Sequence, residues 1–493
     1  MEYPEPHAML QTQEMRQRPF AEWWRPDIAR QRRDRSGTIA VEGSGPRESA
    51  LPFWGLMTFT FILLLAPQTF FPVLAPVRIA LCTAAVATAA YLCDRFIRRQ
   101  PVTILTREMR LTAGLAGWAI VTLPLSYWPG GSLAFLLGVY GKTLVVFWLL
   151  CNTVTSRRRL RQVAWGLSLM SAPLAATGVK HFLSASFLSP GDAVKRIVGY
   201  EAPLTENPND LALMLNLILP FSLALFLMHR QRGVRALLLS IMLLNVMAVI
   251  LTFSRAGFLT LVTILGMCLW KLRRRPERVW AAAALALGIL CVPFLPSGYV
   301  ERVGTIMDIN ADPTGSAQAR WNDTLAALHF VARNPIIGSG VGANVLALNA
   351  ERGEAWKAVH NAYLEYAVEL GIPGLVLFLL LLVGCITSAT GVRQRSAPLP
   401  AFRDLSCLAE GIQISLSGFA VAALFHPVGY QFYFYYLAGF AVATRAVFQA
   451  EMRQVIPCQN PLAPGREGST PRDGDSRILD WHGCGSLGGR FGR

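Results

Sequence analysis

Long apolar runs dominate the sequence and restrict the fold to a membrane architecture. A helix that crosses a bilayer needs ~20 mostly apolar residues, and about twelve runs of that kind are present. They cover residues 51–71, 76–93, 111–127, 132–154, 161–181, 211–229, 235–253, 257–271, 280–296, 372–390, 405–425 and 431–448. Hydrophobic residues make up 53% of the chain and charged residues 15%. We therefore predict an all-α, polytopic membrane protein with about twelve transmembrane helices.

Positive charge alternates between successive connections of these runs. The connections rich in Arg and Lys lie at 95–110, 157–161, 230–235, 271–278 and 393–403. The short connections that carry no Lys or Arg lie at 67–76, 127–131 and 426–430. Since Lys and Arg accumulate on the cytoplasmic side, we expect both termini in the cytoplasm. The net charge of +16 is then mostly a topology signal, and we predict no nucleic-acid partner.

The apolar runs and the charge pattern divide the chain into membrane blocks, outer loops and tails. The predicted units are a basic disordered cytoplasmic tail at 1–50, transmembrane helices 1–5 at 51–181, an outer loop at 182–210, transmembrane helices 6–9 at 211–296, a large outer loop at 297–371, transmembrane helices 10–12 at 372–448, and a disordered cytoplasmic tail at 449–493. Neither outer loop is long enough to be an independent enzyme domain. Chemistry there would be shared with the membrane surface, which indicates a lipid-linked substrate.

Three arginines on the predicted outer side run against the orientation rule and need a physical reason. Arg255, in TFSRAGFL, lies between two apolar runs, where a lone arginine usually has a partner. A snorkelling anchor is the alternative for Arg255. Arg320 and Trp321 lie in a predicted helix at 319–332, and an exposed helix arginine is the alternative there. Arg196, in the first outer loop, is the third candidate.

The stretch HNAYLEYAVELGIPG begins at His360 and places an imidazole next to a membrane entry point. Histidine has the ordinary pKa closest to neutrality, so His360 is a candidate general base. The alternative is a hydrogen-bonded surface histidine at a helix start. The residues after Asn361 predict a short helix with Gly371 as its C-cap. His426, also on the outer side, is a reserve candidate base.

Several permanent cations and one imidazole would thus lie together near the lipid surface. Arginine can bind phosphate oxygens in a bidentate way, and a diphosphate leaving group needs charge neutralisation more than protonation. His360 would take the proton from an acceptor hydroxyl. We predict neither a metal ion nor a cofactor, because no metal-ligand cluster is visible. Gly338, Gly340 and Gly342 imitate a nucleotide-binding pattern but lack its strand–helix context, so they predict a flexible or tightly turning loop.

The pattern His-Asn-x9-Gly-x-x-Gly resembles the signature of bacterial O-antigen ligases and the related Wzy-type O-antigen polymerases. Its four positions are His360, Asn361, Gly371 and Gly374. Ser254-Arg255 and Arg320-Trp321 fit that family as well, as does a large periplasmic loop before the tenth span. The motifs cover roughly residues 190–390, and hydropathy alone relates the rest.

The resemblance implies a GT-C-like, metal-independent glycosyltransferase of the bacterial inner membrane. Its donor would be a glycan on undecaprenyl diphosphate, and its acceptor a glycan or lipid A-core at the periplasmic face. Catalysis would then fall to His360, Arg255 and Arg320. The candidate substrate-binding residues are Arg196, Asn361, Asn209 and Trp321.

Ligase and polymerase share these motifs, so both remain open. Two functions of other classes also remain: a transporter or flippase of lipid-linked glycans, and a non-catalytic scaffold of a secretion machine. Acidic residues avoid the centres of the spans, apart from Glu410, and the large one-sided loop favours chemistry on the outer face.

Overall fold

All regular elements in the described part of the chain are helices. A computed structural model describes residues 49–187, 196–273, 279, 298–304, 306, 315–353 and 356–455. The predicted ninth span at 280–296 and most of both tails lie outside these residues. The main helices before the large loop are α3 (Leu51–Leu65), α5 (Ile79–Ile97), α6 (Arg107–Thr122), α7 (Pro129–Phe135), α8 (Gly141–Thr153), α9 (Arg157–Leu183), α10 (Pro208–Met228), α11 (Arg232–Leu251) and α12 (Arg255–Leu272). The helices that follow are α14 (Tyr299–Gly304), α15 (Ser316–Arg333), α16 (Asn344–Arg352), α17 (Ala362–Ser396), α18 (Arg403–Ala422) and α19 (Phe432–Val455).

Each predicted apolar run inside the described residues coincides with a helix. Seven helical segments there are both long and apolar enough to cross a membrane: 79–97, 129–153, 208–228, 232–251, 255–272, 362–396 and 400–422. Leu51–Leu65 is a shorter apolar helix. The prediction of an all-helical, membrane-embedded protein is therefore confirmed in outline. The number of twelve spans, the GT-C-like architecture and the unit boundaries stay predictions.

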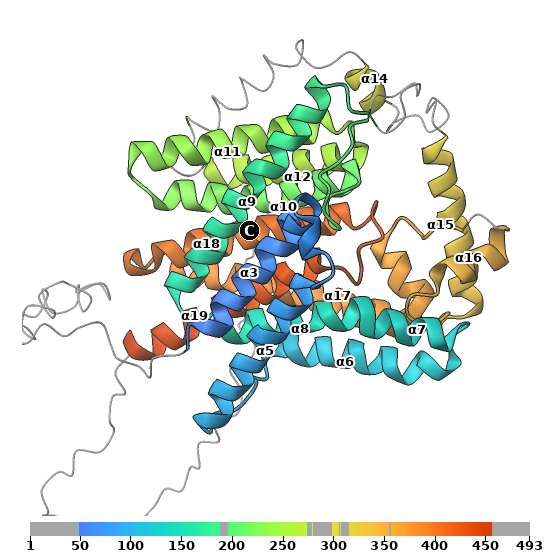
Figure 1. Cartoon of the computed structure of the whole chain (residues 1–493), viewed down its shortest axis with the longest axis horizontal. Helices are drawn as coiled ribbons and strands as arrows, with labels where there is room; N and C mark the ends of the chain where they lie inside the picture. The colour runs from blue at the N-terminus through green and yellow to red at the C-terminus, as the bar shows by residue number, and fades with distance from the viewer. Residues whose placement is uncertain are drawn as a thin grey trace, which may run out of the picture. The chain divides into compact units, whose positions relative to one another are not determined.

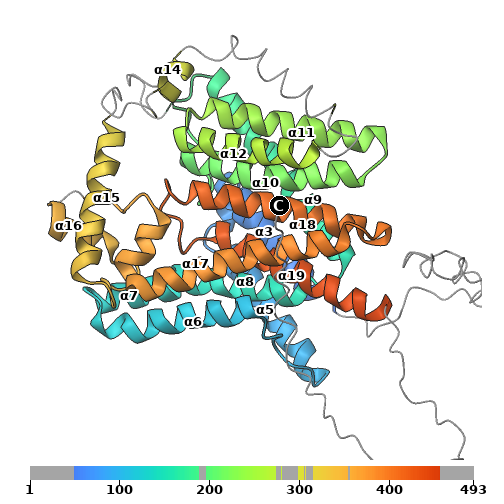
Figure 2. The same cartoon turned by 180° about the vertical axis from the view of Figure 1, so that it is seen from behind.

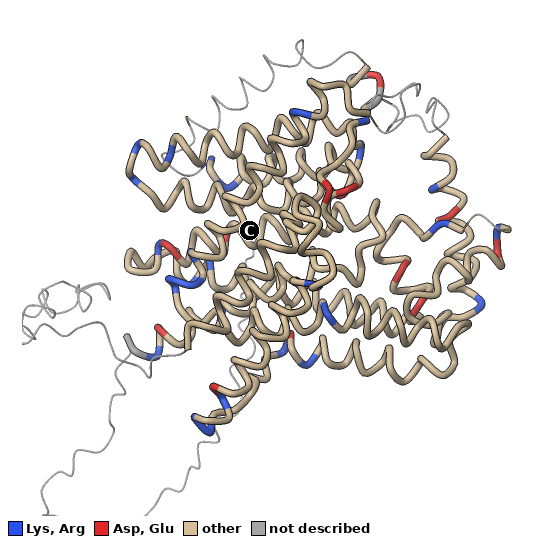
Figure 3. The backbone as a smooth tube through the Cα atoms, in the orientation of Figure 1, with Lys and Arg blue, Asp and Glu red and all other residues tan. Residues whose placement is uncertain are grey.

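The long apolar helices lie side by side, with α10 near the centre. It packs against α9, α11, α12 and α18, and most of its side chains are buried. In both views α15 runs across the ends of these helices instead of alongside them (Figures 1 and 2). Lys and Arg gather at the opposite end, around the α10–α11 connection (Figure 3). Which end faces the cytoplasm stays a prediction from the orientation rule.

A small helical cluster positions α15 at this end. α15 and α16 pack on the start of α17 around Ala327, Phe330, Leu348 and Val368, all of which are buried. The helix α15 begins at Ser316, three residues earlier than the predicted start at 319. Burial of these apolar side chains stabilises the cluster and fixes the direction in which α15 presents its polar residues.

The glycine loop between α15 and α16 turns tightly. Gly338, Gly340 and Gly342 all have positive φ, the backbone region that glycine adopts without steric cost. The buried Glu369 carboxylate accepts hydrogen bonds from the Gly342 and Asn344 backbone N–H groups at 2.7 and 3.3 Å. The prediction of a tightly turning loop is confirmed, and its role is to join the α15–α16 cluster to α17.

The helix α17 is kinked at Gly371. The sequence predicted that a short helix ends here, and this is confirmed: Gly371 has a non-helical backbone with φ of 67° and ψ of −173°, and a second helical stretch follows it within α17. A Cβ atom at Gly371 would lie 2.2 Å from the Ile336 carbonyl oxygen. The next N–H group, of Ile372, donates to the Pro335 carbonyl at 2.7 Å. The segment before α16 thus passes so close to the kink that only glycine fits.

Gly371→Ala should destabilise the protein by at least about 1 kcal/mol, because a residue with a Cβ resists positive φ and would clash with Ile336. Gly384→Ala is the matched control in the same helix, since nothing lies within 4 Å of its added Cβ. Thermal unfolding of the detergent-solubilised proteins checks this. Equal melting temperatures for the two variants would contradict the steric requirement for glycine at position 371.

Candidate functional site

Arg196 and the start of α10 form the first part of the site. Arg196 donates through Nη2 to the Asn209 side-chain oxygen at 2.8 Å. Ser254 Oγ donates to the same oxygen at 2.8 Å. Asn207 caps α10 and Pro208 occupies its first turn. Asn209 is thereby held in place and joins the first outer loop to the turn between α11 and α12.

Arg255 is the first residue of α12, and Ser254 is its N-cap. The Ser254 hydroxyl accepts a hydrogen bond from the Gly257 N–H at 3.1 Å. Arg255 Nη2 donates to Ser316 Oγ at 2.9 Å. Ser316 is the first residue of α15, so this contact links α12 to the helix that carries Arg320. The positive end of the α12 dipole and a guanidinium therefore coincide, an arrangement suited to an anion.

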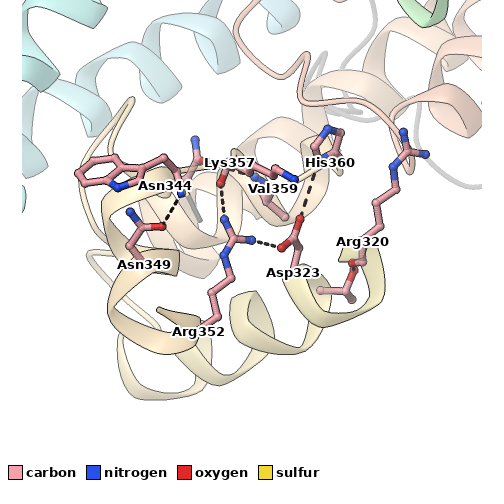
Figure 4. A network of polar contacts seen from close by, with 10 residues as sticks. Arg320, Asp323, Asn344, Asn349, Arg352, Lys357, Val359 and His360 are labelled. Carbon is pink, nitrogen blue, oxygen red and sulfur yellow. Dashed lines mark hydrogen bonds and ion pairs between the residues drawn. The ribbon is translucent and has the colours of Figure 1, made fainter. Parts of the chain in front are cut away.

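Arg320 lies one turn after Ser316, in the second turn of α15 and not in the first as the sequence predicted. Figure 4 shows its guanidinium beside the His360 ring, with the two side chains coming from different segments. Its positive charge lowers the pKa of His360 and also that of His426. The structure thus brings Arg320 and His360 near each other. Ser316, one turn before Arg320 in α15, accepts the hydrogen bond from Arg255 and so connects Arg255 to the same site.

His360 lies just before α17 and is half-buried. Its Nδ1 atom lies 3.9 Å from the Asp323 carboxylate, which is also paired with Arg352 (Figure 4). Burial, followed by the charge of Arg320 and the neighbouring His426, lowers the pKa of His360 to about 4. A ring with that pKa is neutral at physiological pH, so it has a lone pair that can accept a proton.

His426 lies in the connection between α18 and α19 and is only 2% exposed. Its Nδ1 atom lies 3.0 Å from the Ala422 carbonyl oxygen. Burial lowers its pKa, the Arg320 charge lowers it further, and the carbonyls of Ala422 and Asn209 oppose both effects. The sequence named His426 only as a reserve, yet it lies in the same electrostatic group as Arg320 and His360.

Two other predicted site residues have clear structural settings. The Asn361 side-chain oxygen accepts from the Tyr363 and Leu364 N–H groups at 2.9 and 3.2 Å, so it caps α17. Trp321 is 50% exposed on the outer surface of α15. By capping α17, Asn361 fixes the backbone next to His360. Direct substrate contact by Asn361 or Trp321 stays a prediction.

Sequence reasoning missed the partners that position these side chains. The buried Asp323 and the half-buried Arg352 form an ion pair behind His360, and Ser316 connects two helices. Asp323 follows Arg320 by three residues, which is the one sequence signal that both belong to the same helix surface. Arg352 lies in a different helix, and no spacing relates it to Asp323.

The arrangement combines three guanidinium groups with two neutral imidazoles at one end of the helices. Within the described ranges no group of three His, Cys, Asp or Glu residues could hold a metal ion. Arginines suit diphosphate oxygens, and a neutral imidazole suits proton removal. Metal independence stays a prediction.

Comparison with known families assigns the central part of the chain. Residues 240–379 match the family model described as O-antigen ligase. The predicted resemblance to the O-antigen ligase family is confirmed over this stretch. No curated protein matches the chain.

The O-antigen ligase match contains three of the candidate catalytic residues and part of their setting. It includes Arg255, Arg320, His360 and Gly371, but not Arg196, Asn209 or His426. The match supports a membrane glycan enzyme of the ligase or polymerase type. Residues outside it join the site only through the tertiary structure.

Arg320→Gln should raise the pKa of His360, because removing a nearby positive charge stabilises the imidazolium. Diethyl pyrocarbonate modifies only the neutral ring, so its pH dependence at His360, read by peptide mass spectrometry, reports that pKa. Arg333→Gln, an exposed arginine on the same helix, is the control. A wild-type midpoint at the ordinary value of 6.5 would contradict the electrostatic account.

Proposed function

We propose that the protein is a periplasmic-face glycosyltransferase of the bacterial inner membrane. It moves a glycan from undecaprenyl diphosphate to an acceptor hydroxyl, as an O-antigen ligase does with lipid A-core. The single observation that supports this best is the grouping of Arg255, Arg320 and His360 at one end of the membrane helices. The O-antigen ligase match over the same residues adds independent support.

The reaction follows from the charges of the site. The acceptor hydroxyl oxygen attacks the anomeric carbon of the donor sugar, and the bond from that carbon to the diphosphate oxygen breaks. His360 takes the hydroxyl proton. The departing diphosphate keeps the bonding electrons, and Arg255 and Arg320 stabilise its added negative charge. We propose that Arg196, whose guanidinium donates to Asn209, contacts the same diphosphate or the first sugar.

The low pKa of His360 has a role in this sequence. The free site holds the ring neutral, so it is ready to accept a proton. When the donor binds, diphosphate charge near Arg320 offsets the repulsion that disfavours the imidazolium. The base therefore becomes stronger when the donor is present, which couples donor binding to acceptor activation.

A repeat-unit polymerase is the second candidate, because it differs only in the acceptor. In that case the hydroxyl belongs to another lipid-linked glycan. A flippase accounts less well for the site, since the arginines and His360 gather at one end of the helices and not near their middle. The cytoplasmic placement of both termini belongs to the proposal as well.

His360→Ala should lower glycan transfer by ~10²–10⁴-fold, the usual contribution of a general base. The variant is expressed in a strain that lacks the native gene, and surface glycan is compared with undecaprenyl-linked glycan. His329→Ala, an exposed histidine on α15, is the matched control. Loss of chains on lipid A-core while linked polymer accumulates indicates a ligase, and single repeat units alone indicate a polymerase. Normal product from His360→Ala would refute the catalytic role.

Arg255→Lys should retain part of the activity that Arg255→Ala loses. Lysine keeps the positive charge but lacks the two-pronged geometry that grips neighbouring phosphate oxygens. Loss of one such contact lowers turnover by ~10²–10³-fold in comparable anion sites. Turnover of purified lipid-linked donor by wild type, Arg255→Lys and Arg255→Ala measures this ranking of activities. Full activity in Arg255→Ala would mean that Arg255 only anchors the helix at the membrane interface.

A further inference from the structure

The His426 ring carries a buried nitrogen that the fold does not use. Its Nδ1 atom contacts the Ala422 carbonyl at 3.0 Å. A carbonyl oxygen only accepts, so Nδ1 must carry the proton and donate it. In the neutral ring the Nε2 atom then presents a lone pair. Nε2 is buried and has no hydrogen-bond partner among the residues that the structure describes.

The position of His426 relative to the catalytic group is fixed by backbone contacts. The Ala362 N–H donates to the Ala423 carbonyl at 2.8 Å, and the Tyr363 hydroxyl donates to the Ala420 carbonyl at 2.7 Å. These bonds hold the start of α17, and with it His360, against the end of α18. The connection that carries His426 follows directly.

The charges and hydrogen-bonding groups around Nε2 limit the chemical class of ligand that could bind there. A lone pair repels phosphate oxygens, and the nearby Arg320 charge disfavours a cation. The Asn209 backbone carbonyl, another acceptor, also lies near this ring. Because the Nε2 lone pair and the Asn209 carbonyl are both acceptors, the group that binds here should be a neutral hydrogen-bond donor. Sugar hydroxyls are the neutral donors that a glycan substrate supplies in quantity.

We propose that His426 Nε2 accepts a hydrogen bond from a hydroxyl of the acceptor glycan and so holds that sugar beside His360. The inference rests on the function proposed above and assigns an acceptor subsite to the α18–α19 connection. The division of labour is chemical: the arginines bind the anionic donor, and His426 binds the neutral acceptor. His426 is a binding residue here and takes no proton.

Two substitutions separate this role from a structural one. In His426→Asn the amide N–H₂ occupies the place of Nδ1 and can still donate to Ala422, but nothing replaces Nε2. In His426→Gln the longer side chain puts an amide oxygen near the place of Nε2. We expect Asn to raise the acceptor KM roughly tenfold, the value of one hydrogen bond, with donor KM and melting temperature unchanged. Gln should restore most of the acceptor affinity.

The assay uses the full chain in proteoliposomes, with lipid-linked glycan as donor and lipid A-core as the varied acceptor. If the glycan profile of the His360 variant indicates a polymerase, a lipid-linked repeat unit replaces lipid A-core. Wild-type kinetics in His426→Asn would overturn the subsite. So would loss of kcat in both variants, which indicates proton transfer, or loss of stability in Gln alone, which indicates a structural contact with Ala422.

Failure of this inference and failure of the proposed function are distinguishable. If His360→Ala abolishes transfer while His426→Asn behaves as wild type, the transferase stands and the acceptor subsite is wrong. If His360→Ala is fully active, the catalytic proposal fails whatever His426 does.

Discussion

The close passage of the chain at Gly371 ties the outer helices to the membrane helices. Residues 335–336 press against the kink, and the Ile372 N–H bond to Pro335 leaves no room for a side chain at Gly371. The carboxylate of Glu369, two residues earlier in α17, accepts a hydrogen bond from the Gly342 N–H group in the glycine loop. The direction of α15, and therefore the place of Arg320, depends on this junction.

The arginines near the site have different kinds of partner. Arg352 pairs with the buried Asp323, so its charge is neutralised within the protein. Arg196 and Arg255 donate hydrogen bonds to the neutral side-chain oxygens of Asn209 and Ser316 respectively. Burial, followed by the positive charge of Arg320, lowers the pKa of His360 and keeps the imidazole free of a proton.

Much of the architecture was accessible from local patterns, and its limits have physical causes. Apolar runs predicted the long helices because hydrocarbon length sets their size. The helix at Arg320 followed from the periodic spacing of its apolar residues. Gly371 was correctly predicted as a helix end, but the sequence does not show that the Ile336 carbonyl lies against it. His426 was predicted only as a reserve base, since it lies 66 positions after His360 in the chain.

The sequence by itself determined the membrane class, the helices and the identity of the candidate chemical groups. Hydropathy, charge alternation and the His360 motif are properties of neighbouring residues, so they can be read without a fold. Only the tertiary structure decided which groups lie near one another: Arg255 donates to Ser316, and Arg320, His360 and His426 lie close enough for their charges to interact. These residues are far apart in the chain. They depend on how helices pack and where the chain kinks, which local sequence does not encode.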